Sequence, residues 1–481
     1  MKKILILIIL LFLSHSSRLV GTPTSTISTV FQEKLDQILQ NPVLKPATIG
    51  IEIIGANEEG ESSTRPYYSR NSEKLFVPAS GAKIIISLAA LSLLKPEYQF
   101  KTEVFLDSES DNLYIKGSGD PSLNTKDLEL IADKIIEHGI KRIENIIYDD
   151  SYFDQQEIGE GWIEEPEAFG FNARISALSL NNNCVRIFIK PAETPGKEVK
   201  FMLYPETNFI GVINTAYTGH KDSLYVERKL IVSRNYLVLK GEIRKESPGK
   251  TFIRHIENPS LYTATVFKEI LEDMGIEVKG IVEARASTYP DEILDSLKPI
   301  YIHYSEPLLH LIYEMNKESI NFYAEQILKT IGAELSEPPG SFGKGRLKLQ
   351  EFLKNIGLEK NEFMIYDGSG LSRYNLISPK GVVKVLLYGL RDPEIGPEFL
   401  SSLPIAGIDG TLQKRLRGSS AVRKVRAKTG TMRSISSLSG YVQTEKENLI
   451  VFSIIMNNYT APASIIRKIQ DNIVELIISE L

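Results

Sequence analysis

The sequence predicts a mixed α/β domain that is built from both ends of the chain and interrupted by a long β-rich insertion. The chain has 481 residues. At about 150 residues per domain, this length is too great for a single hydrophobic core. Strand-like patterns lie near both termini with helical patterns between them, whereas the middle consists of short β-like runs. We expect residues 22–95 and 298–481 to form one domain and residues 96–297 to form two small inserted domains.

The N-terminus is typical of an export signal. Met1, Lys2 and Lys3 precede an apolar stretch at residues 4–13 and a polar stretch at residues 14–17. The apolar stretch is shorter than the roughly 20 residues that span a bilayer. We expect residues 1–21 to be a signal peptide, with an uncleaved anchor as the alternative. The mature chain would then be periplasmic or otherwise exported, with no stable membrane anchor.

Composition argues against several classes of site and partner. A formal net charge of −5 gives no broad basic field, so nucleic-acid binding is not expected. Cys184 is the only cysteine and cannot form an internal disulfide. No two histidines are spaced four apart and none lies near the cysteine, so no metal site is expected.

The first elements of the chain are two strands and a helix. Residues 48–54 and 66–69 read as strands, with the polar residues 55–64 as the loop between them. Pro78 then marks the start of a helix whose apolar run covers residues 84–94.

Short β-like runs separated by Gly, Pro, Asn and Asp predict the strands of the insertion. These runs lie at residues 102–106, 112–116, 142–148, 185–190, 199–204, 224–232 and 236–242. Helical periodicity predicts helices at residues 259–274, 308–331 with an interruption only at residues 319–321, 347–355, 379–389 and 463–480. Residues 433–442 and 449–457 alternate like paired strands, which returns the chain to the first domain.

Ser80 and Lys83 place a hydroxyl and an amine one helical turn apart at the start of the apolar helix. A serine hydroxyl is a poor nucleophile until a base removes its proton. A lysine does this only when neutral, so its pKa must fall by roughly three units. Burial and a second cation, for which Lys428 is the candidate, would both lower it. The pair predicts a serine enzyme that transfers acyl groups.

Two later segments supply the remaining groups of such a site. Ser319 would relay the proton to the leaving amine, and Asn321 offers a donor and an acceptor for a substrate amide. The lysine and threonines of Lys428-Thr429-Gly430-Thr431 would hold a terminal carboxylate, and its glycine would let an edge strand approach the substrate. The backbone amides of Ser80 and Thr431 are candidates for an oxyanion hole.

Each motif alone is weak evidence, because short motifs recur by chance. Ser80 alone would suit a helix N-cap, and Lys428 a solvated charge at a strand edge. Order and context favour a site, since the serine and lysine open an apolar helix, Ser319 lies in a helical region and Lys428 precedes a strand pair.

These motifs match the Ser-x-x-Lys, Ser-x-Asn and Lys-Thr-Gly signature of penicillin-binding enzymes. The chain resembles the class C low-molecular-mass penicillin-binding proteins, which are D-alanyl-D-alanine carboxypeptidases that also act as endopeptidases. The segments that carry the resemblance are residues 78–83, 117–121, 176–183, 315–321, 367–373, 407–412 and 428–431. Ile320 stands where many relatives carry Asp, which we expect to alter packing more than chemistry.

The resemblance implies a penicillin-binding/β-lactamase-like transpeptidase domain with two domains inserted after the active-site helix. It implies no metal or organic cofactor, peptidoglycan stem peptides as substrates and β-lactams as covalent inhibitors. The residues to which it gives roles are Ser80 as nucleophile, Lys83 as its base, Ser319 and Asn321 as a second wall, Lys428, Thr429 and Thr431 as a third, and Lys317 at the border of the cleft. Residues 367–373 and 409–415 stay open between a role in the site and a purely structural role as turn and loop organiser.

Two other functions remain open at this point. A β-lactamase would use the same nucleophile with fast deacylation, but the sequence carries no evident deacylating glutamate motif. A catalytically inactive wall-binding protein of the same fold would have lost a reactive position, and all of them are present here.

Overall fold

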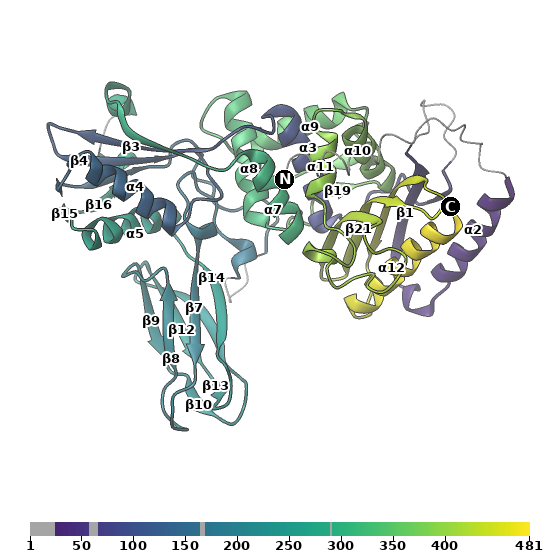
Figure 1. The fold of residues 1–481 in the computed structure, drawn as a ribbon, viewed down its shortest axis with the longest axis horizontal. Coiled ribbons are helices and arrows are strands. Elements are labelled where there is room, and N and C mark those ends of the chain that lie inside the picture. Colours follow the sequence, from purple (N-terminus) through teal and green to yellow (C-terminus); the bar gives the residue numbers. More distant parts are fainter. Residues whose placement is uncertain (1–24, 57–65, 164–168, 289–290) are drawn as a thin grey trace.

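The computed structural model describes residues 25–56, 66–163, 169–288 and 291–481. The expected signal peptide at residues 1–21 therefore lies outside the described residues. Figure 1 shows an elongated molecule in which one part holds both the first described helix, α2, and the last helix, α12, and the inserted region extends to the other side and downward. Among the described residues, no helix combines the length and apolar character needed to cross a membrane.

The sheet of the first part has the strand order β2-β1-β22-β21-β20. Strand β1 (Thr48–Gly55), from the N-terminal part of the chain, pairs antiparallel along its length with β22 (Leu449–Asn457) near the C-terminus. The other strands are β2 (Tyr68–Arg70), β20 (Val425–Met432) and β21 (Ile435–Gln443). This pairing confirms the prediction that one domain is assembled from both chain ends.

Two helical layers cover the faces of this sheet. On one face, α2 (Ser25–Leu39) and α12 (Ala463–Glu480) share a hydrophobic cluster with alternate strand residues such as Ile51 and Ile454. On the other face, α10 (Pro379–Arg391) packs on β1 and β22. Successive side chains of a strand point to opposite faces of the sheet, so apolar residues at both sets of positions can pack against both helical layers.

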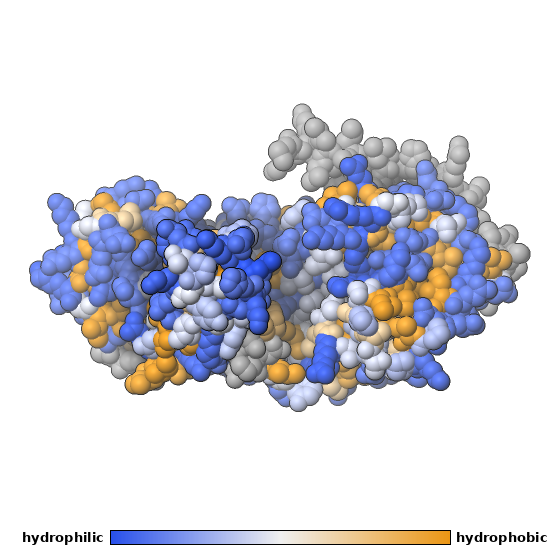
Figure 2. Space-filling view, turned by 90° about the horizontal axis from the view of Figure 1, so that it is seen from below, coloured by the Kyte–Doolittle hydropathy of each residue, from blue (hydrophilic) through white to orange (hydrophobic). Residues whose placement is uncertain are grey.

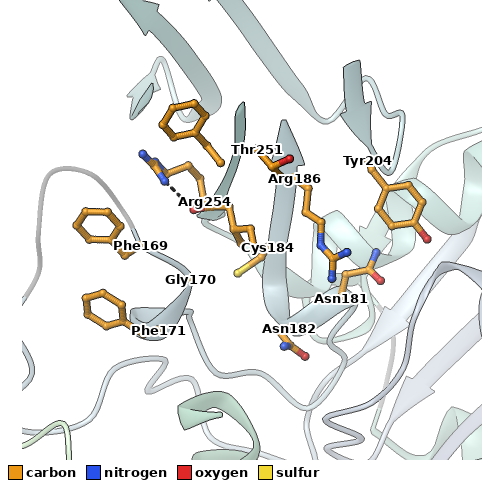
Figure 3. Close-up of a pocket in the computed structure, with 12 residues that line it drawn as sticks. Phe169, Gly170, Phe171, Asn181, Asn182, Cys184, Arg186, Tyr204, Thr251 and Arg254 are labelled. Atoms are coloured by element: carbon orange, nitrogen blue, oxygen red, sulfur yellow. Dashed lines mark hydrogen bonds between the residues drawn. The ribbon is translucent and has the colours of Figure 1, made fainter. Parts of the chain in front are cut away.

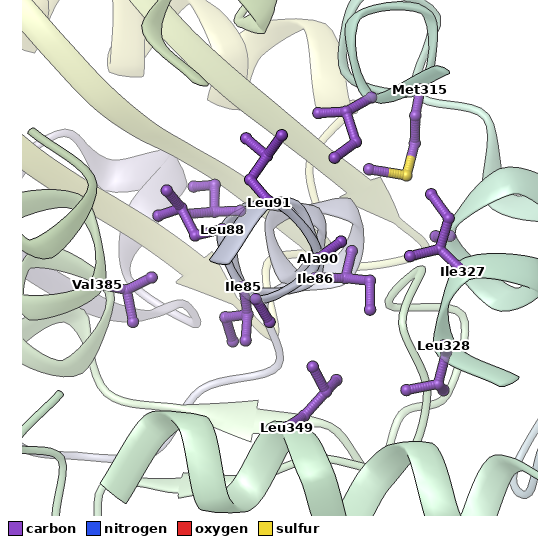
Figure 4. Close-up of a cluster of buried hydrophobic side chains, with 14 of the residues drawn as sticks. Ile85, Ile86, Leu88, Ala90, Leu91, Met315, Ile327, Leu328, Leu349 and Val385 are labelled. Atoms are coloured by element: carbon purple, nitrogen blue, oxygen red, sulfur yellow. The ribbon is translucent and has the colours of Figure 1, made fainter. Parts of the chain in front are cut away.

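Helix α3 (Lys83–Leu93) is the centre of the second layer. Its residues from Lys83 to Leu91 are all buried, as expected for a helix that is apolar on every side. Figure 4 shows this helix end-on, with Met315, Leu349 and Val385 arranged around it. The surrounding helices are α7 (Leu308–Glu318), α8 (Asn321–Ser336), α9 (Phe342–Asn355) and α11 (Gly396–Ser402), and a short pair of strands, β18 (Phe363–Met364) and β19 (Leu376–Ile377), lies beside them.

The inserted region begins with a mixed sheet that carries two helices. The strands are β3 (Lys101–Asp107), β4 (Asn112–Gly117), β6 (Ile146–Asp149), β16 (Val282–Ala284) and β17 (Pro299–Tyr304), in the order β16-β6-β4-β3-β17. Helices α4 (Thr125–Glu137) and α5 (Pro259–Asp273) pack together, and the small elements β5 (Arg142–Ile143), β15 (Glu277–Val278) and α6 (Arg285–Thr288) complete this part.

The second inserted part consists of strands only. One sheet has the order β14-β7-β8, with β7 (Cys184–Lys190), β8 (Lys200–Tyr204) and β14 (Lys250–His255). The other sheets contain β9 (Ile210–Asn214), β11 (Tyr225–Ile231) and β12 (Arg234–Lys240), and the pair β10 (Tyr217–Gly219) and β13 (Glu242–Arg244). A single hydrophobic cluster joins these strands to α4 and α5.

Two sequence expectations for the insertion need correction. The first part is not β-rich throughout, because residues 125–137 form a helix that was not predicted. The second boundary at 297/298 lies too early, since β17 pairs with β3 and so belongs to the inserted sheet. The three asparagines 181–183 do form a turn, all with φ between 51° and 57°, a left-handed conformation that asparagine tolerates.

The molecular surface is predominantly polar where it can be seen from below. Figure 2 shows hydrophilic residues over much of that face, with hydrophobic groups scattered between them. Such scattered groups are normal for a folded protein surface.

Candidate active site

Ser80 lies in the 3-10 turn η2 (Ala79–Ala82) that leads directly into α3. The residue before it, Ala79, has φ +48°, which is uncommon for a residue with a side chain. The carbonyl of Ala79 lies so close to Gly370 that a Cβ there would collide with it. A tight turn against a neighbouring loop therefore presents the Ser80 hydroxyl, as strained turns often do at functional sites.

Lys83, the first residue of α3, faces three acceptors and is fully buried. Its Nζ lies 3.2 Å from Ser80 Oγ, 2.6 Å from Asn321 Oδ1 and 2.8 Å from the carbonyl oxygen of Ser369. Burial lowers the pKa of Lys83 to about 7, against the opposing effect of the carboxylates of Glu325 and Asp367. At neutral pH a large share of this amine is thus unprotonated and within reach of the hydroxyl.

Ser319 and Asn321 lie at the junction of two helices. Ser319 ends α7 with φ +59°, and Asn321 begins α8. The sequence predicted a helix at residues 308–331 that is interrupted here, and the left-handed Ser319 is the physical cause of the interruption. The junction turns both side chains toward the lysines, since Asn321 accepts from Lys83 and Ser319 Oγ accepts from Lys428 at 2.8 Å.

Lys428 lies within strand β20 and is fully buried. Its Nζ donates to Ser319 Oγ and to the carbonyl of Thr429 at 3.0 Å. Burial and the nearby ammonium of Lys83 lower the pKa of Lys428 well below its ordinary value. The sequence predicted that Lys428, as a second cation, would help to lower the pKa of Lys83. In the structure, burial is the main cause of the lowered pKa of Lys83. The charge of Lys83 instead lowers the pKa of Lys428.

Packing around Ser80 requires a glycine at position 430. A Cβ at this position would lie 2.5 Å from the carbonyl oxygen of Pro78 and closer still to Ser437 Oγ. The glycine therefore lets β20 press against the turn that carries Ser80. This packing is a second reason for the glycine, beside the predicted approach of the substrate.

A cavity of about 310 Å³ opens over these residues. Its lining contains Ser80, Ser319, Thr429 and Thr431, which come from the three motifs that the sequence analysis selected. Three further residues complete the lining, namely Thr411, Arg415 and Arg467. Thr411 accepts a hydrogen bond from Thr429 Oγ1 at 2.8 Å. The sequence did not single out Arg467 as a site residue, because charged residues are common on the amphipathic helix α12.

The structure does not place Lys317 in this cavity. Its Nζ donates to the carbonyl of Leu403 at 2.6 Å and to Asp409 Oδ2 at 2.7 Å, and its side chain is 5% exposed. A Cβ on Gly410 would collide with the backbone of Lys317. Lys317 thus anchors the loop that leads to Thr411.

The loop at residues 367–375 holds one of the three acceptors of Lys83. Asp367 accepts from the amides of Gly370 and Ser372, at 2.8 and 2.6 Å, and from the side chain of Asn375. It also accepts from Trp162 Nε1 of the inserted region, at 2.9 Å. Asp367 thus organises this loop, and the loop in turn places the Ser369 carbonyl against Lys83.

Glu325 supports the same loop from helix α8. Its carboxylate accepts from the amides of Gly368 and Ser369, at 3.1 and 2.7 Å. Burial and the neighbouring Asp367 raise the pKa of Glu325 to about 8. Sequence reasoning missed both Glu325 and Trp162, since neither lies in a motif. Among the described residues, no group of side chains is arranged to hold a metal ion.

Comparisons with known proteins agree with this geometry. A model of the D-Ala-D-Ala carboxypeptidase 3 (S13) family matches residues 31–479. A D-alanyl-D-alanine carboxypeptidase of Actinomadura sp. is 30% identical over 466 residues, which cover 92% of this chain and 84% of that protein. The D-alanyl-D-alanine carboxypeptidase DacB of Haemophilus influenzae is 27% identical and covers 81% of this chain and 82% of its own length.

The fold is also found among solved structures. Penicillin binding protein 4 (dacB) from H. influenzae superposes with a TM-score of 0.80 at 23% identity, covering 92% of this chain and 99% of that chain. The same protein complexed with a novel β-lactam gives a TM-score of 0.76. These likenesses establish the fold and its large insertion.

Proposed function

Because this chain belongs to the D-Ala-D-Ala carboxypeptidase 3 (S13) family and is a serine-type D-Ala-D-Ala carboxypeptidase, we propose that it cleaves peptidoglycan peptides through an acyl-enzyme at Ser80. The observation that carries the assignment of the nucleophile is the contact of 3.2 Å between its hydroxyl and the buried amine of Lys83. Ser319, the other serine in the described lining of the cavity, contacts Lys428 instead of Lys83.

Acylation follows from this geometry. Neutral Lys83 takes the proton of Ser80, and Oγ attacks the carbonyl carbon of the penultimate D-Ala. The bond to the terminal D-Ala breaks, and the leaving amine takes a proton through Ser319, whose hydroxyl Lys428 holds at 2.8 Å. A water molecule then attacks the ester and restores the free serine. The backbone amides of Ser80 and Thr431 stabilise the oxyanion in this proposal.

The terminal carboxylate of the substrate would lie at the third wall of the cavity. Thr429 and Thr431 line it, and the buried Nζ of Lys428 contacts both Thr429 and Ser319 of the lining. An arriving carboxylate favours the charged form of Lys428. Substrate binding and protonation of this lysine are therefore coupled, and Lys83 stays the group that is free to accept the serine proton. Lys317 acts as a positioning residue for the loop that contains Thr411.

β-Lactams should acylate the same serine, and a β-lactam complex of the H. influenzae relative is consistent with this. We also propose export to the periplasm or another part of the cell envelope, because the basic and apolar N-terminus suits a signal peptide and the substrate lies outside the cytoplasm. The stem peptides of peptidoglycan are the proposed physiological partner.

Digestion of purified muropeptides tests the proposed function. Monomers that end in D-Ala-D-Ala should lose one D-Ala, and cross-linked dimers should be split at the D-Ala bond, because both reactions use the same acylation site. Mass spectrometry of the products distinguishes the two. Unchanged monomers would contradict the carboxypeptidase activity, and unchanged dimers would contradict the endopeptidase activity.

The Trp162→Phe substitution tests the positioning of the base through the loop at residues 367–375. The variant loses the hydrogen bond to Asp367 but keeps an aromatic ring against Phe342, 6.0 Å away. We expect kcat to fall by about tenfold with little change in KM, because a small misplacement of a catalytic group has effects of this order. Steady-state kinetics on a D-Ala-D-Ala peptide provide the measurement.

Phe342→Leu is the matched control, since it removes the ring contact and leaves the donor of Trp162 in place. Both variants should lower the thermal midpoint by a few degrees. Only Trp162→Phe should lower kcat. Equal losses of kcat in both would show that the tryptophan contributes to stability alone.

A further inference from the structure

A second and larger cavity, of about 550 Å³, lies in the inserted region. This volume is within the range of roughly 300–1,000 Å³ that is typical of small-molecule sites. Figure 3 shows that its residues come from the segment around Gly170, from the asparagine turn and from strands β7, β8 and β14. Gly170 permits the close wall, because a Cβ there would lie 3.1 Å from Ile253 and 3.3 Å from Cys184.

One side of this cavity is built from stacked planar groups. The rings of Phe169 and Phe171 are stacked 5.4 Å apart with an interplanar angle of 13°. The guanidinium of Arg254 lies 5.3 Å from the centre of Phe169 and 5.4 Å from that of Phe252. Phe171 ends the stack and is 47% exposed. The stack therefore leaves an aromatic ring accessible at its end.

The other side carries polar groups suited to hydroxyl and amide ligands. Arg186 lies on β7 between Tyr204 of β8 and Ile253 of β14, its cross-strand neighbours. Its side chain is exposed and forms no hydrogen bond or ion pair within the described part of the chain. Tyr204 is 48% exposed, and the side chains of Asn181 and Asn182 lie nearby (Figure 3). The described lining contains no acidic side chain.

The wall of this cavity is connected to the active site. Asn321 Nδ2 donates to the carbonyl oxygen of Phe171 at 3.1 Å, while its Oδ1 accepts from Lys83. Three hydrogen bonds thus lead from Ser80 through Lys83 and Asn321 to the aromatic stack. An extended peptide covers about 3.5 Å per residue, so a stem of a few residues can join a scissile bond at Ser80 to a group in the cavity.

We propose that this cavity binds the N-acetylated glycan strand from which the stem peptide hangs, an inference that rests on the proposed function. Exposed aromatic rings suit the apolar faces of pyranose sugars. The guanidinium of Arg186 and the amides of the asparagines supply donors for acetamido and hydroxyl oxygens. The lack of acidic lining disfavours a cationic peptide. A concave site of this size with few polar groups fits a short oligosaccharide better than a flat protein surface.

The test measures direct binding of a β-1,4-linked tetramer of N-acetylglucosamine to the full chain. Isothermal titration calorimetry or NMR titration detects the binding. The tetramer should bind saturably, and a glucose tetramer without acetamido groups should bind at least about tenfold more weakly, which corresponds to one lost recognition contact. Arg186→Ala and Tyr204→Ala should each weaken binding of the N-acetylated tetramer about tenfold.

Lys190→Ala is the matched control, because it removes a cation from the same face of the same strand outside the cavity lining. It should bind the tetramer like the wild-type chain, with thermal midpoints verifying that all variants are folded. Absence of saturable binding, equal binding of both tetramers, or equal effects of the Arg186 and Lys190 substitutions would overturn the inference. The tetramer lacks a stem peptide, so failure here leaves penicillin labelling of Ser80 as a separate test of the proposed function.

Discussion

Replacing Ser80 by alanine is expected to reduce D-Ala release by roughly 10⁴-fold or more, as for the loss of the nucleophile in other serine hydrolases. Ser80 is the hydroxyl that contacts Lys83, whereas Ser319, the other serine of the described lining, contacts Lys428. The change removes one oxygen from a half-buried side chain and leaves the turn η2 intact. The measurement is the initial rate of D-Ala release from a peptide that ends in D-Ala-D-Ala.

Ser92→Ala is the matched control for this substitution. Ser92 lies on the same helix, α3, and its hydroxyl contacts Tyr388 away from the cavity. Its loss should leave the rate within about twofold of the wild type, as is usual for substitutions outside a site. A Ser80→Ala chain that retained a substantial part of the wild-type rate would show that another residue is acylated.

The second large effect is expected at Lys83. Lys83→Met keeps the length of the side chain but removes the base. We expect kcat to fall by about 10³-fold or more. This is near the upper end of what a general base contributes, and the loss of the hydrogen bonds that position Ser80 adds to it. In the wild-type chain the rate should increase about tenfold per pH unit below pH 7 and level off above it, since only the neutral amine accepts the proton. The residual rate of the variant should not show this dependence.

Stability should respond to pH in a defined direction at the same residue. The pKa of Lys83 is about 7 in the folded chain, below its ordinary value of about 10.4 in an unfolded chain. The folded state therefore carries the full cost of the buried amine below pH 7, and the cost disappears as the pH rises toward 10.4. The free energy of unfolding of wild type relative to Lys83→Met should increase over that interval.

A wild-type rate that stayed flat from pH 5 to pH 8 would contradict the assignment of Lys83 as base.

Much of the catalytic site could be predicted because the residues that carry its chemistry lie in short sequence motifs. Ser80 and Lys83 belong to one helix turn, so their contact follows from helical spacing alone. Lys428 and Ser319 are far apart in the sequence, and only the motif order indicated that they meet. The strands β1 and β22 were both expected, and their pairing follows from closing one domain with the two ends of the chain.

The features that were missed depend on tertiary contacts or on weak local signals. The hydrogen bond from Trp162 to Asp367 and that from Asn321 to the Phe171 carbonyl join segments more than 100 residues apart, with no motif at the inserted end. The helix α4 did have a local signal, a capping box formed by Asn124 and Asp127. It was overlooked because its surroundings consist of short β-like runs.

The alternative β-lactamase function differs from the proposed one in the lifetime of the acyl-enzyme. Glu325 is a buried carboxyl group that acts electrostatically on Lys83, and both of its oxygens accept hydrogen bonds from the backbone amides of residues 368 and 369. It is thus not available to activate a deacylating water. Slow release of a bound β-lactam is the behaviour that this arrangement favours.

Intact-mass analysis of the full chain after incubation with penicillin, followed by peptide mapping, tests the central claim most directly. The account predicts one persistent adduct per chain, located on the peptide that contains Ser80. An adduct on Ser319 or on any other residue, or no adduct at all in a folded chain, would contradict it.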